Sequence, residues 1–286
     1  AREREHQRGE PGIELGCDPG RARSQAYRLP VHRNWYRATI SHNTVVVDRA
    51  SQEGAEGQSE LFTSGPDLAA AAARIDRAYP AIIHRRLLVL RPGFLVVADV
   101  LTSTDGKPHT FDWLYHNRGE AIDCPAATRE APAPEGQGFE YVSDIRCGTS
   151  GEPIRAVVAM DAGRVHILLN GEAGTDVLVG TGVGESVLDR VPMLAATRRG
   201  QSACFAAVVD PATKGQADEV DGIEIQPHET SGYVIRVRLS NGAQELFAYD
   251  PTGNRRAVAG VETQSKLLCL RQESQKPARI LWEAKD

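Results

Sequence analysis

His42 is the residue whose chemistry stands out first, because an imidazole titrates near neutral pH and can bind a metal through either ring nitrogen. It ends a polar stretch, Arg37–Asn43, that leads directly into Thr44–Val47. β-Branched residues of this kind favour a strand, and a strand fixes the position of the side chain before it. We therefore consider His42 a candidate for proton transfer or metal binding. The plainer interpretation is a structural histidine at the mouth of a strand.

Two upstream features favour a functional role for His42. Asp18 begins a D-P-G turn, and Tyr27 lies between that turn and His42. A carboxylate and an imidazole both suit zinc, whereas a tyrosine hydroxyl can act as a general acid or base. A short stretch of sequence thus holds side chains suited to metal binding and to proton transfer.

The order of these residues resembles the junction region of heparinase II/III-like polysaccharide lyases, which include heparin, heparan and alginate lyases. Members carry a D-P-G turn, a tyrosine, a tryptophan-tyrosine pair and an H-N-T-V segment followed by an aspartate and a glutamine. In this chain the matching residues begin at Asp18, include Tyr27 and continue from Trp35 to Gln52. Arg49 stands where the family commonly has glycine. The resemblance covers residues 12–215, more diffusely downstream. It implies elimination chemistry on glycans that contain uronic acids.

The rest of the chain has the pattern of strands joined by turns. Asn241-Gly242, between two apolar runs, is a strong hairpin signal. Strands are expected over residues 82–90, 94–101, 109–116, 154–160, 165–170, 203–209, 233–239, 245–250 and 266–271. His84 is interpreted as a strand-edge residue. Residues 69–77 favour a helix by propensity, but their context favours a strand. The pattern predicts an all-β protein, a large antiparallel β-sandwich.

Length and composition fit one large domain or two small ones. The chain has 286 residues, 41% of them hydrophobic, which can bury a sizeable core. We expect residues 1–11 to form a charged, flexible segment and residues 12–286 to form the β-sandwich, with a possible subdivision near residues 215–230. Gly180–Gly184 superficially resembles a phosphate-binding glycine loop, but no helix is expected after it, so we interpret it as a flexible turn.

Charge and hydropathy exclude several classes of partner. The net charge is −5, so no overall positive field favours nucleic acid, and no apolar run approaches the roughly 18 residues of a membrane span. Five arginines near the H-N segment could nevertheless form a local positive groove: Arg21, Arg23, Arg28, Arg33 and Arg37. Scattered, solvated arginines explain the same pattern equally well.

The resemblance implies how an active site would be shared. In the family, the cleft lies between an N-terminal α/α toroid and the β-sandwich, and the toroid supplies a catalytic tyrosine and the group that neutralises the uronate. Tyr27 matches the sandwich's own tyrosine, so Tyr27 and His42 are the catalytic candidates. Asp18 and His42 match two ligands of a structural zinc ion, whose third ligand is expected outside this chain. We therefore expect the chain alone to be incomplete and inactive.

The substrate-binding candidates are Trp35, Tyr36, Arg37 and His116. An aromatic ring can stack on a sugar, and a guanidinium can pair with a carboxylate through two hydrogen bonds. Equally, the two aromatic residues can anchor the loop to the core, and Arg37 can form a surface salt bridge. His109 and His116 lie on opposite faces of one expected strand, so at most one can face a cleft, and we favour His116.

The sequence is compatible with two functions. In the first, the chain is the sandwich portion of a lyase that cleaves an acidic polysaccharide by β-elimination, with a toroid as partner and, by resemblance, a periplasmic or secreted location. It would contribute one wall of the cleft and part of the zinc site. In the second, it is a non-catalytic carbohydrate-binding or structural module with Trp35, Tyr36 and Arg37 as its sugar-binding face. Formation of an unsaturated product distinguishes the two.

Overall fold

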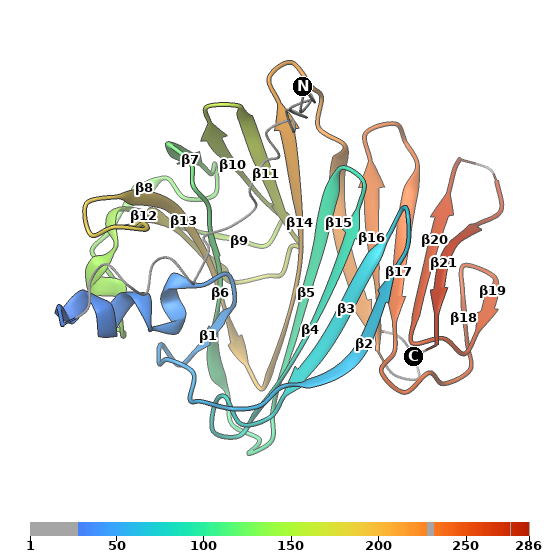
Figure 1. The fold of residues 1–286 in the computed structure, drawn as a ribbon, viewed down its shortest axis with the longest axis horizontal. Helices are drawn as coiled ribbons and strands as arrows, with labels where there is room; N and C mark the ends of the chain where they lie inside the picture. Colours follow the sequence, from blue (N-terminus) through green and yellow to red (C-terminus); the bar gives the residue numbers. More distant parts are fainter. Residues whose placement is uncertain (1–27, 228–231, 275, 286) are drawn as a thin grey trace, which may run out of the picture.

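The computed structural model describes residues 28–227, 232–274 and 276–285. Asp18, Tyr27 and the expected flexible segment 1–11 lie outside these ranges. Within them, antiparallel sheets are stacked in layers, and short helical segments gather at one side (Figure 1). The predicted all-β class is confirmed. None of the described helices has the length and apolar character needed to cross a membrane.

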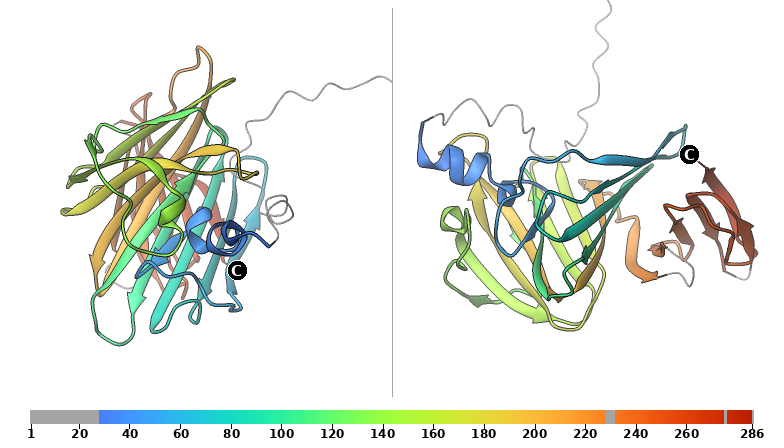
Figure 2. Two further views of the ribbon diagram at one scale, coloured as in Figure 1. Left: turned by 90° about the vertical axis from the view of Figure 1, so that its left-hand side faces the viewer. Right: turned by 90° about the horizontal axis from the view of Figure 1, so that it is seen from below.

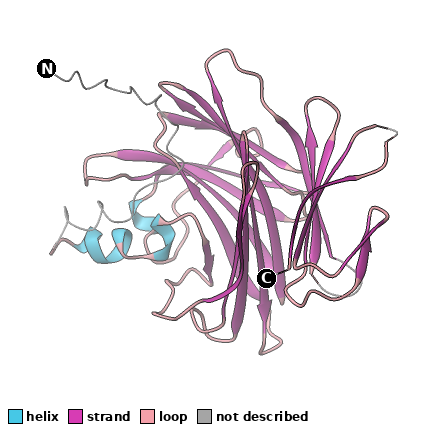
Figure 3. Ribbon diagram, turned by 45° about the vertical axis from the view of Figure 1, so that its right-hand side comes forward, coloured by secondary structure: helices cyan, strands magenta, loops and turns pink. Residues whose placement is uncertain are grey.

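The first sheet has the strand order β1-β6-β13-β12-β9-β8. Its strands are β1 (Val45–Val47), β6 (His109–His116), β8 (Arg129–Glu130), β9 (Ser143–Ser150), β12 (Thr175–Val183) and β13 (Arg190–Gly200). The helical segments beside it are η1 (His32–Tyr36), η2 (Thr39–Ser41) and η3 (Phe139–Tyr141) (Figure 3). They cover its outer face, because Trp35, Ile40 and Phe139 form one apolar cluster with Leu114 and Met193 of the sheet.

The second sheet has the order β2-β3-β4-β5-β14-β11-β10-β7. Its strands are β2 (Gln58–Ser64), β3 (Ala69–Ile75), β4 (Ile82–Arg91), β5 (Phe94–Ser103), β7 (Ala121–Asp123), β10 (Ile154–Met160), β11 (Gly163–Leu169) and β14 (Ser202–Thr213). The two sheets form the sandwich, with Trp113 and Leu194 of the first packed in one core with Ile167 and Phe205 of the second.

A third sheet, in the order β15-β16-β17-β20-β21, lies on the other face of the second sheet. Its strands are β15 (Val220–Pro227), β16 (Tyr233–Leu239), β17 (Gln244–Tyr249), β20 (Leu267–Gln272) and β21 (Arg279–Ala284), and the hairpin β18 (Arg256–Val258) and β19 (Val261–Thr263) follows β17. Leu87 and Val96 share an apolar cluster with Ile235 and Phe247 of this sheet. The second sheet is therefore buried on both faces over much of its area.

The strands expected from the sequence are found with small shifts at their ends. The alanine-rich segment forms β3, so its context outweighs its helical propensity. The predicted hairpin at Asn241-Gly242 joins β16 to β17, and Gly242 takes the positive φ of 82° that such a turn requires. Turn residues and β-branched runs were thus sufficient signals for these elements.

The prediction of a flexible turn at Gly180–Gly184 is wrong. Gly180 and Gly182 lie inside β12 and pair with β13. A Cβ atom on Gly182 would lie 2.7 Å from the ring of Trp35, and a Cβ atom on Gly180 would lie 2.7 Å from Val142. The glycines therefore make room for side chains packed on the outer face of the first sheet.

We expect Gly182→Ala to lower the free energy of unfolding by about 1–3 kcal/mol, because the buried ring of Trp35 must shift to admit a methyl group. Gly54→Ala is the matched control, since no atom lies within 4 Å of its Cβ position. The control should be neutral or stabilising by less than about 1 kcal/mol. Urea unfolding followed by tryptophan fluorescence measures both. Equal midpoints for the two variants would contradict the close packing of Trp35 on β12.

Candidate functional site

The H-N segment, His42-Asn43, is held between two sheets. The side-chain Oδ1 of Asn43 accepts a hydrogen bond from the backbone N–H of His116 at 2.6 Å, and its Nδ2 donates to the carbonyl of His116 at 3.2 Å. On the other side, Nη1 of Arg86 donates to the backbone carbonyl of Asn43 at 2.7 Å. Asn43 therefore ties β6 of the first sheet to β4 of the second, and this fixes the backbone of His42.

Arg86 is oriented by Asp99, which is fully buried on β5. Nε and Nη2 of Arg86 donate to the two carboxylate oxygens of Asp99 at 2.7 and 2.9 Å. Nε2 of His84 lies 2.6 Å from Oδ1, and Nε1 of Trp113 donates to Oδ2 at 3.1 Å. Burial opposes the negative charge, but Arg86 and His84 outweigh it and hold the pKa of the Asp99 carboxyl well below its usual range.

This network corrects the interpretation of His84. It was expected at a strand edge, yet β4 pairs with β3 on one side and β5 on the other, and the imidazole is buried against Asp99. The sequence pattern did not indicate this role because a histidine in an apolar strand carries no sign of its partner.

We expect Asp99→Asn to lower the free energy of unfolding by about 3–5 kcal/mol, because it removes the charge that compensates a largely buried guanidinium. Glu262→Gln is the control. It removes the carboxylate from the pair with Arg255, which is exposed and lies 3.1 Å away, and should cost less than about 1 kcal/mol. Denaturant unfolding of both variants provides the measurement. Similar losses would mean that the Asp99 network does not stabilise the fold.

His116 lies beneath the H-N segment and is buried. Its Nε2 donates to the carbonyl of Ile40 at 2.7 Å, and its ring meets that of Trp35 edge-on with centroids 5.8 Å apart. Burial lowers the pKa of His116 to about 4, the hydrogen bond to Ile40 opposes this shift, and the nearby His42 adds to it. In this arrangement His116 is a neutral support for the loop that carries His42, and a sugar cannot reach its ring.

The other predicted substrate-binding residues separate into two groups. Trp35 is 1% exposed and its Nε1 donates to the carbonyl of Val183 at 2.9 Å. Tyr36 is also buried, and burial, with a contribution from Asp189, raises the pKa of its hydroxyl. Both rings anchor η1 to the first sheet, which is the second of the two roles considered for them, and stacking on a sugar would require them to leave this core. Arg37, in contrast, is exposed.

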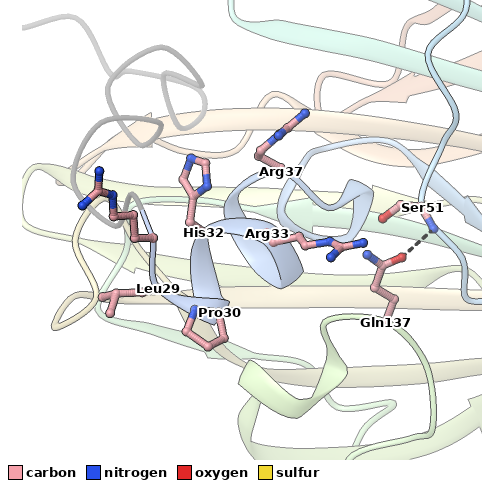
Figure 4. A pocket seen from close by; sticks show the side chains of 8 residues that line it. Leu29, Pro30, His32, Arg33, Arg37, Ser51 and Gln137 are labelled. Carbon is pink, nitrogen blue, oxygen red and sulfur yellow. Dashed lines mark hydrogen bonds between the residues drawn. The ribbon is translucent and has the colours of Figure 1, made fainter.

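Arg37 borders an open hollow of about 730 Å³ beside η1 (Figure 4). The hollow is lined by Arg28, Leu29, Pro30, His32, Arg33, Arg37, Ser51 and Gln137. The backbone N–H of Ser51 donates to Oε1 of Gln137 at 3.2 Å, which closes one side. Arg28, Arg33 and Arg37 of the predicted positive groove thus meet in one place, whereas Arg21 and Arg23 lie outside the described residues.

The second sheet also presents an apolar shelf, formed by Phe62 on β2 and by Leu88 and Leu90 on β4. Their exposed fractions are 74%, 36% and 51%. Phe62 and Leu88 flank Ala71 in register, so the shelf lies on one face of the sheet. Strand alternation puts Arg86 on this same face, so the shelf adjoins the H-N segment. The β2–β3 side of the sheet projects away from the first sheet (Figure 2).

The turn after β1 explains the family's preference for glycine at position 49. Asp48 and Arg49 have positive φ values of 48° and 56°, and the N–H of Ala50 donates to the carbonyl of Val47, as in a type I′ turn. A side chain is strained in this conformation. Here the guanidinium of Arg49 lies 5.2 Å from the ring centroid of Phe139, a contact that offsets part of the strain.

The position of the D-P-G turn relative to His42 stays a prediction, because Asp18 and Tyr27 lie outside the described residues. Within the described ranges, no group of three or more His, Cys, Asp and Glu side chains is arranged to hold a metal ion. A zinc site with three such ligands that includes His42 therefore needs at least one of them from outside those ranges.

Comparison with known proteins decides the family. The model of the heparinase II/III-like C-terminal domain matches residues 12–246, from the D-P-G region into the third sheet. The chain belongs to this family. An alginate lyase from Stenotrophomonas maltophilia (strain K279a) is 27% identical over 247 residues, which cover 76% of this chain and 33% of that enzyme.

Solved structures share the fold of this heparinase II/III-like chain. A heparinase III with methylated lysines matches with a TM-score of 0.59 and 15% identity, over 79% of this chain and 32% of its own. The heparan sulfate lyase HepC from Pedobacter heparinus matches with a TM-score of 0.54 and 14% identity, over 80% and 33%. The predicted family is confirmed, and the chain spans about a third of the length of these relatives.

Proposed function

We propose that this heparinase II/III-like chain is the β-sandwich portion of a polysaccharide lyase that cleaves uronic-acid-containing glycans by β-elimination. The supporting observation is the clamped H-N segment, in which Arg86 and Asn43 fix the backbone of His42 within a family that includes named alginate and heparan sulfate lyases. Elimination requires removal of the proton next to the carboxylate, donation of a proton to the leaving oxygen and stabilisation of the developing negative charge. Tyr27 and His42 are the proton-transfer groups that this chain would contribute.

We assign the H-N segment and the apolar shelf to one wall of the active-site cleft. The shelf, Phe62, Leu88 and Leu90, is apolar surface beside the H-N segment, and exposed apolar surface of this kind marks interaction sites. The matched region covers only about a third of the length of these relatives, so most of their chain is available to form an opposite wall. In this proposal that wall is an N-terminal α/α toroid, so the sandwich alone binds substrate incompletely and is inactive.

The complete enzyme should form an unsaturated uronate product from an acidic polysaccharide, and the sandwich alone should form none. Tyr27→Phe in the complete enzyme should lower kcat at least about 100-fold, because a general acid or base contributes 10²–10⁴-fold. Tyr141→Phe makes the same chemical change on η3 and should leave kcat within about two-fold. Ultraviolet absorbance of the product measures all three.

An unchanged kcat in Tyr27→Phe would remove Tyr27 from the site. Retention of glycan by the complete protein, without product from alginate, heparin or heparan sulfate, would contradict the lyase. That result would favour the alternative, a carbohydrate-binding module.

We further propose that Asp18 and His42 bind a structural zinc ion together with a ligand from outside this chain. His42 is half-buried on a backbone that Asn43 holds in place, and an imidazole with a carboxylate suits zinc. Zinc bound there supplies a clamp between the D-P-G turn and the H-N segment. Tyr27, between the two ligands in sequence, would be restrained by that clamp.

Metal analysis of the complete protein should give about one zinc per chain, lost in His42→Ala because structural sites need their full ligand set. His109→Ala is the control: its Nδ1 lies 2.6 Å from Asp48, away from the H-N segment, so zinc should be retained. Removal of zinc by a chelator should lower the thermal midpoint of the wild type and leave that of His42→Ala unchanged. A folded, active protein without zinc would contradict this assignment.

A further inference from the structure

We propose that the hollow beside η1 binds an anionic sugar unit through Arg28, Arg33 and Arg37. The inference rests on the proposed function, because it names the subsite by which the lyase would hold its acidic glycan. The ligand group is a carboxylate or a sulfate ester on a sugar. A carboxylate presents two oxygens and a sulfate ester presents three, and a guanidinium can bind two oxygens of either group through paired hydrogen bonds.

The described lining of the hollow carries positive charge and no acidic side chain. Arg28, Arg33 and Arg37 line it, and none of their guanidinium groups forms an ion pair or hydrogen bond with any described residue. Other exposed arginines of this acidic chain do have carboxylate partners, as in the pairs Arg199–Asp176 and Arg238–Glu224 at 2.7 and 2.9 Å, whereas Arg77, Arg190 and Arg279 are exposed without such a pair among the described residues. Like charges converging on one hollow repel one another, so an anion is the ligand that this surface favours.

A second hollow of similar size shows that the charge, and not the volume, is distinctive. It measures about 710 Å³ and is also lined by two arginines, Arg74 and Arg77. Its lining includes Glu56 and Asp76, and Nε of Arg74 donates to Asp76 at 2.6 Å. The hollow beside η1 has no acidic residue among its described lining, so its guanidinium groups do not share that lining with a competing carboxylate.

The arginines are presented from a rigid base. η1 buries Trp35 and Tyr36 against the first sheet, and this turns Arg33 and Arg37 toward solvent. Arg33 lies in η1 and Arg37 directly follows it, so two positive charges are carried on one short segment. Because the base is fixed by packing, the backbone needs no ordering when the guanidinium groups bind an anion, and the entropy lost is that of the arginine side chains.

The remaining lining suits a sugar, and the hollow is connected to the H-N segment. Leu29 and Pro30 offer apolar surface to a ring face, and the volume falls within the roughly 300–1,000 Å³ of ligand sites. Oγ of Ser51 accepts a hydrogen bond from the backbone N–H of Thr39 at 3.1 Å. Thr39 begins η2, which ends next to His42. Part of the lining of the hollow is therefore attached to the same segment that carries His42.

The test compares two double variants of the complete protein by calorimetric titration. Arg33→Gln with Arg37→Gln should raise the Kd for an alginate oligosaccharide at least about ten-fold, since hydrogen bonds to charged groups dominate such recognition. Arg74→Gln with Arg77→Gln makes the same charge change in the second hollow and should leave the Kd within about two-fold. Denaturant midpoints near that of the wild type show that both variants are folded.

Three ligands identify the anion. Alginate oligosaccharides carry carboxylates only, heparan sulfate oligosaccharides carry carboxylates and sulfates, and dextran carries neither. Loss of affinity for both acidic ligands assigns the hollow to carboxylates, and loss for heparan sulfate alone assigns it to sulfates. An unchanged Kd for both acidic ligands in the η1 variant, or equally tight binding of dextran, would overturn the subsite.

Kinetic measurements distinguish failure of the subsite proposal from failure of the lyase proposal. Product formation by the complete enzyme with an unchanged KM in the η1 variant contradicts the subsite and leaves the lyase standing. Loss of acidic-glycan affinity in the η1 variant, in a complete protein that forms no product, supports the subsite and contradicts the lyase. A raised KM with a nearly unchanged kcat is the result expected if both are correct.

Discussion

A buried carboxylate, Asp99, determines where the H-N segment lies. A buried charge is costly unless all of its hydrogen-bonding capacity is used, and Arg86, His84 and Trp113 together satisfy both oxygens. Arg86 reaches the carbonyl of Asn43 because Asp99 holds its guanidinium in one orientation. The electrostatics of the core and the position of the candidate site are therefore one network, and neither can change without the other.

The layered architecture makes that network rigid. The second sheet packs against the first through one apolar core and against the third through another, so β4 and β5 lie in the middle of the molecule. A further buried ionic link joins the layers, in which Glu245 of the third sheet accepts hydrogen bonds from Arg91 of β4 at 3.0 and 3.1 Å. Site residues attached to such a central sheet keep their geometry while the surfaces around them remain free to meet other chain segments.

The strands could be predicted because their signals are local. β-Branched runs and Gly-containing turns identify each one, and residues 69–75 were assigned correctly from their neighbours. The pairing of Arg86 with Asp99 was also within reach, because the two are directly opposite each other in the hairpin of β4 and β5, whose register the turn at Gly93 sets.

What the sequence could not supply were contacts between distant segments. Gly182 lies far from Trp35 along the chain. A reader of the sequence does not see their contact, and a glycine at this position then suggests a flexible turn. The burial of Trp35 and the exposure of Arg37 likewise depend on a helical turn that no propensity indicated. Family and fold therefore followed from the sequence, whereas the division of the Trp35–Arg37 stretch into anchors and an exposed cation required coordinates.

Strand β3 is extended because of its neighbours and not because of its own composition. Residues 69–73 are all alanine, the strongest helix former and a poor strand former, so the segment has no intrinsic reason to be extended. Its extended form comes from hydrogen bonds to β4 on one side and β2 on the other. β2, which carries Phe62, is the edge strand of this sheet and pairs with β3. Loss of the pairing between β3 and β4 would therefore also release the edge that displays Phe62.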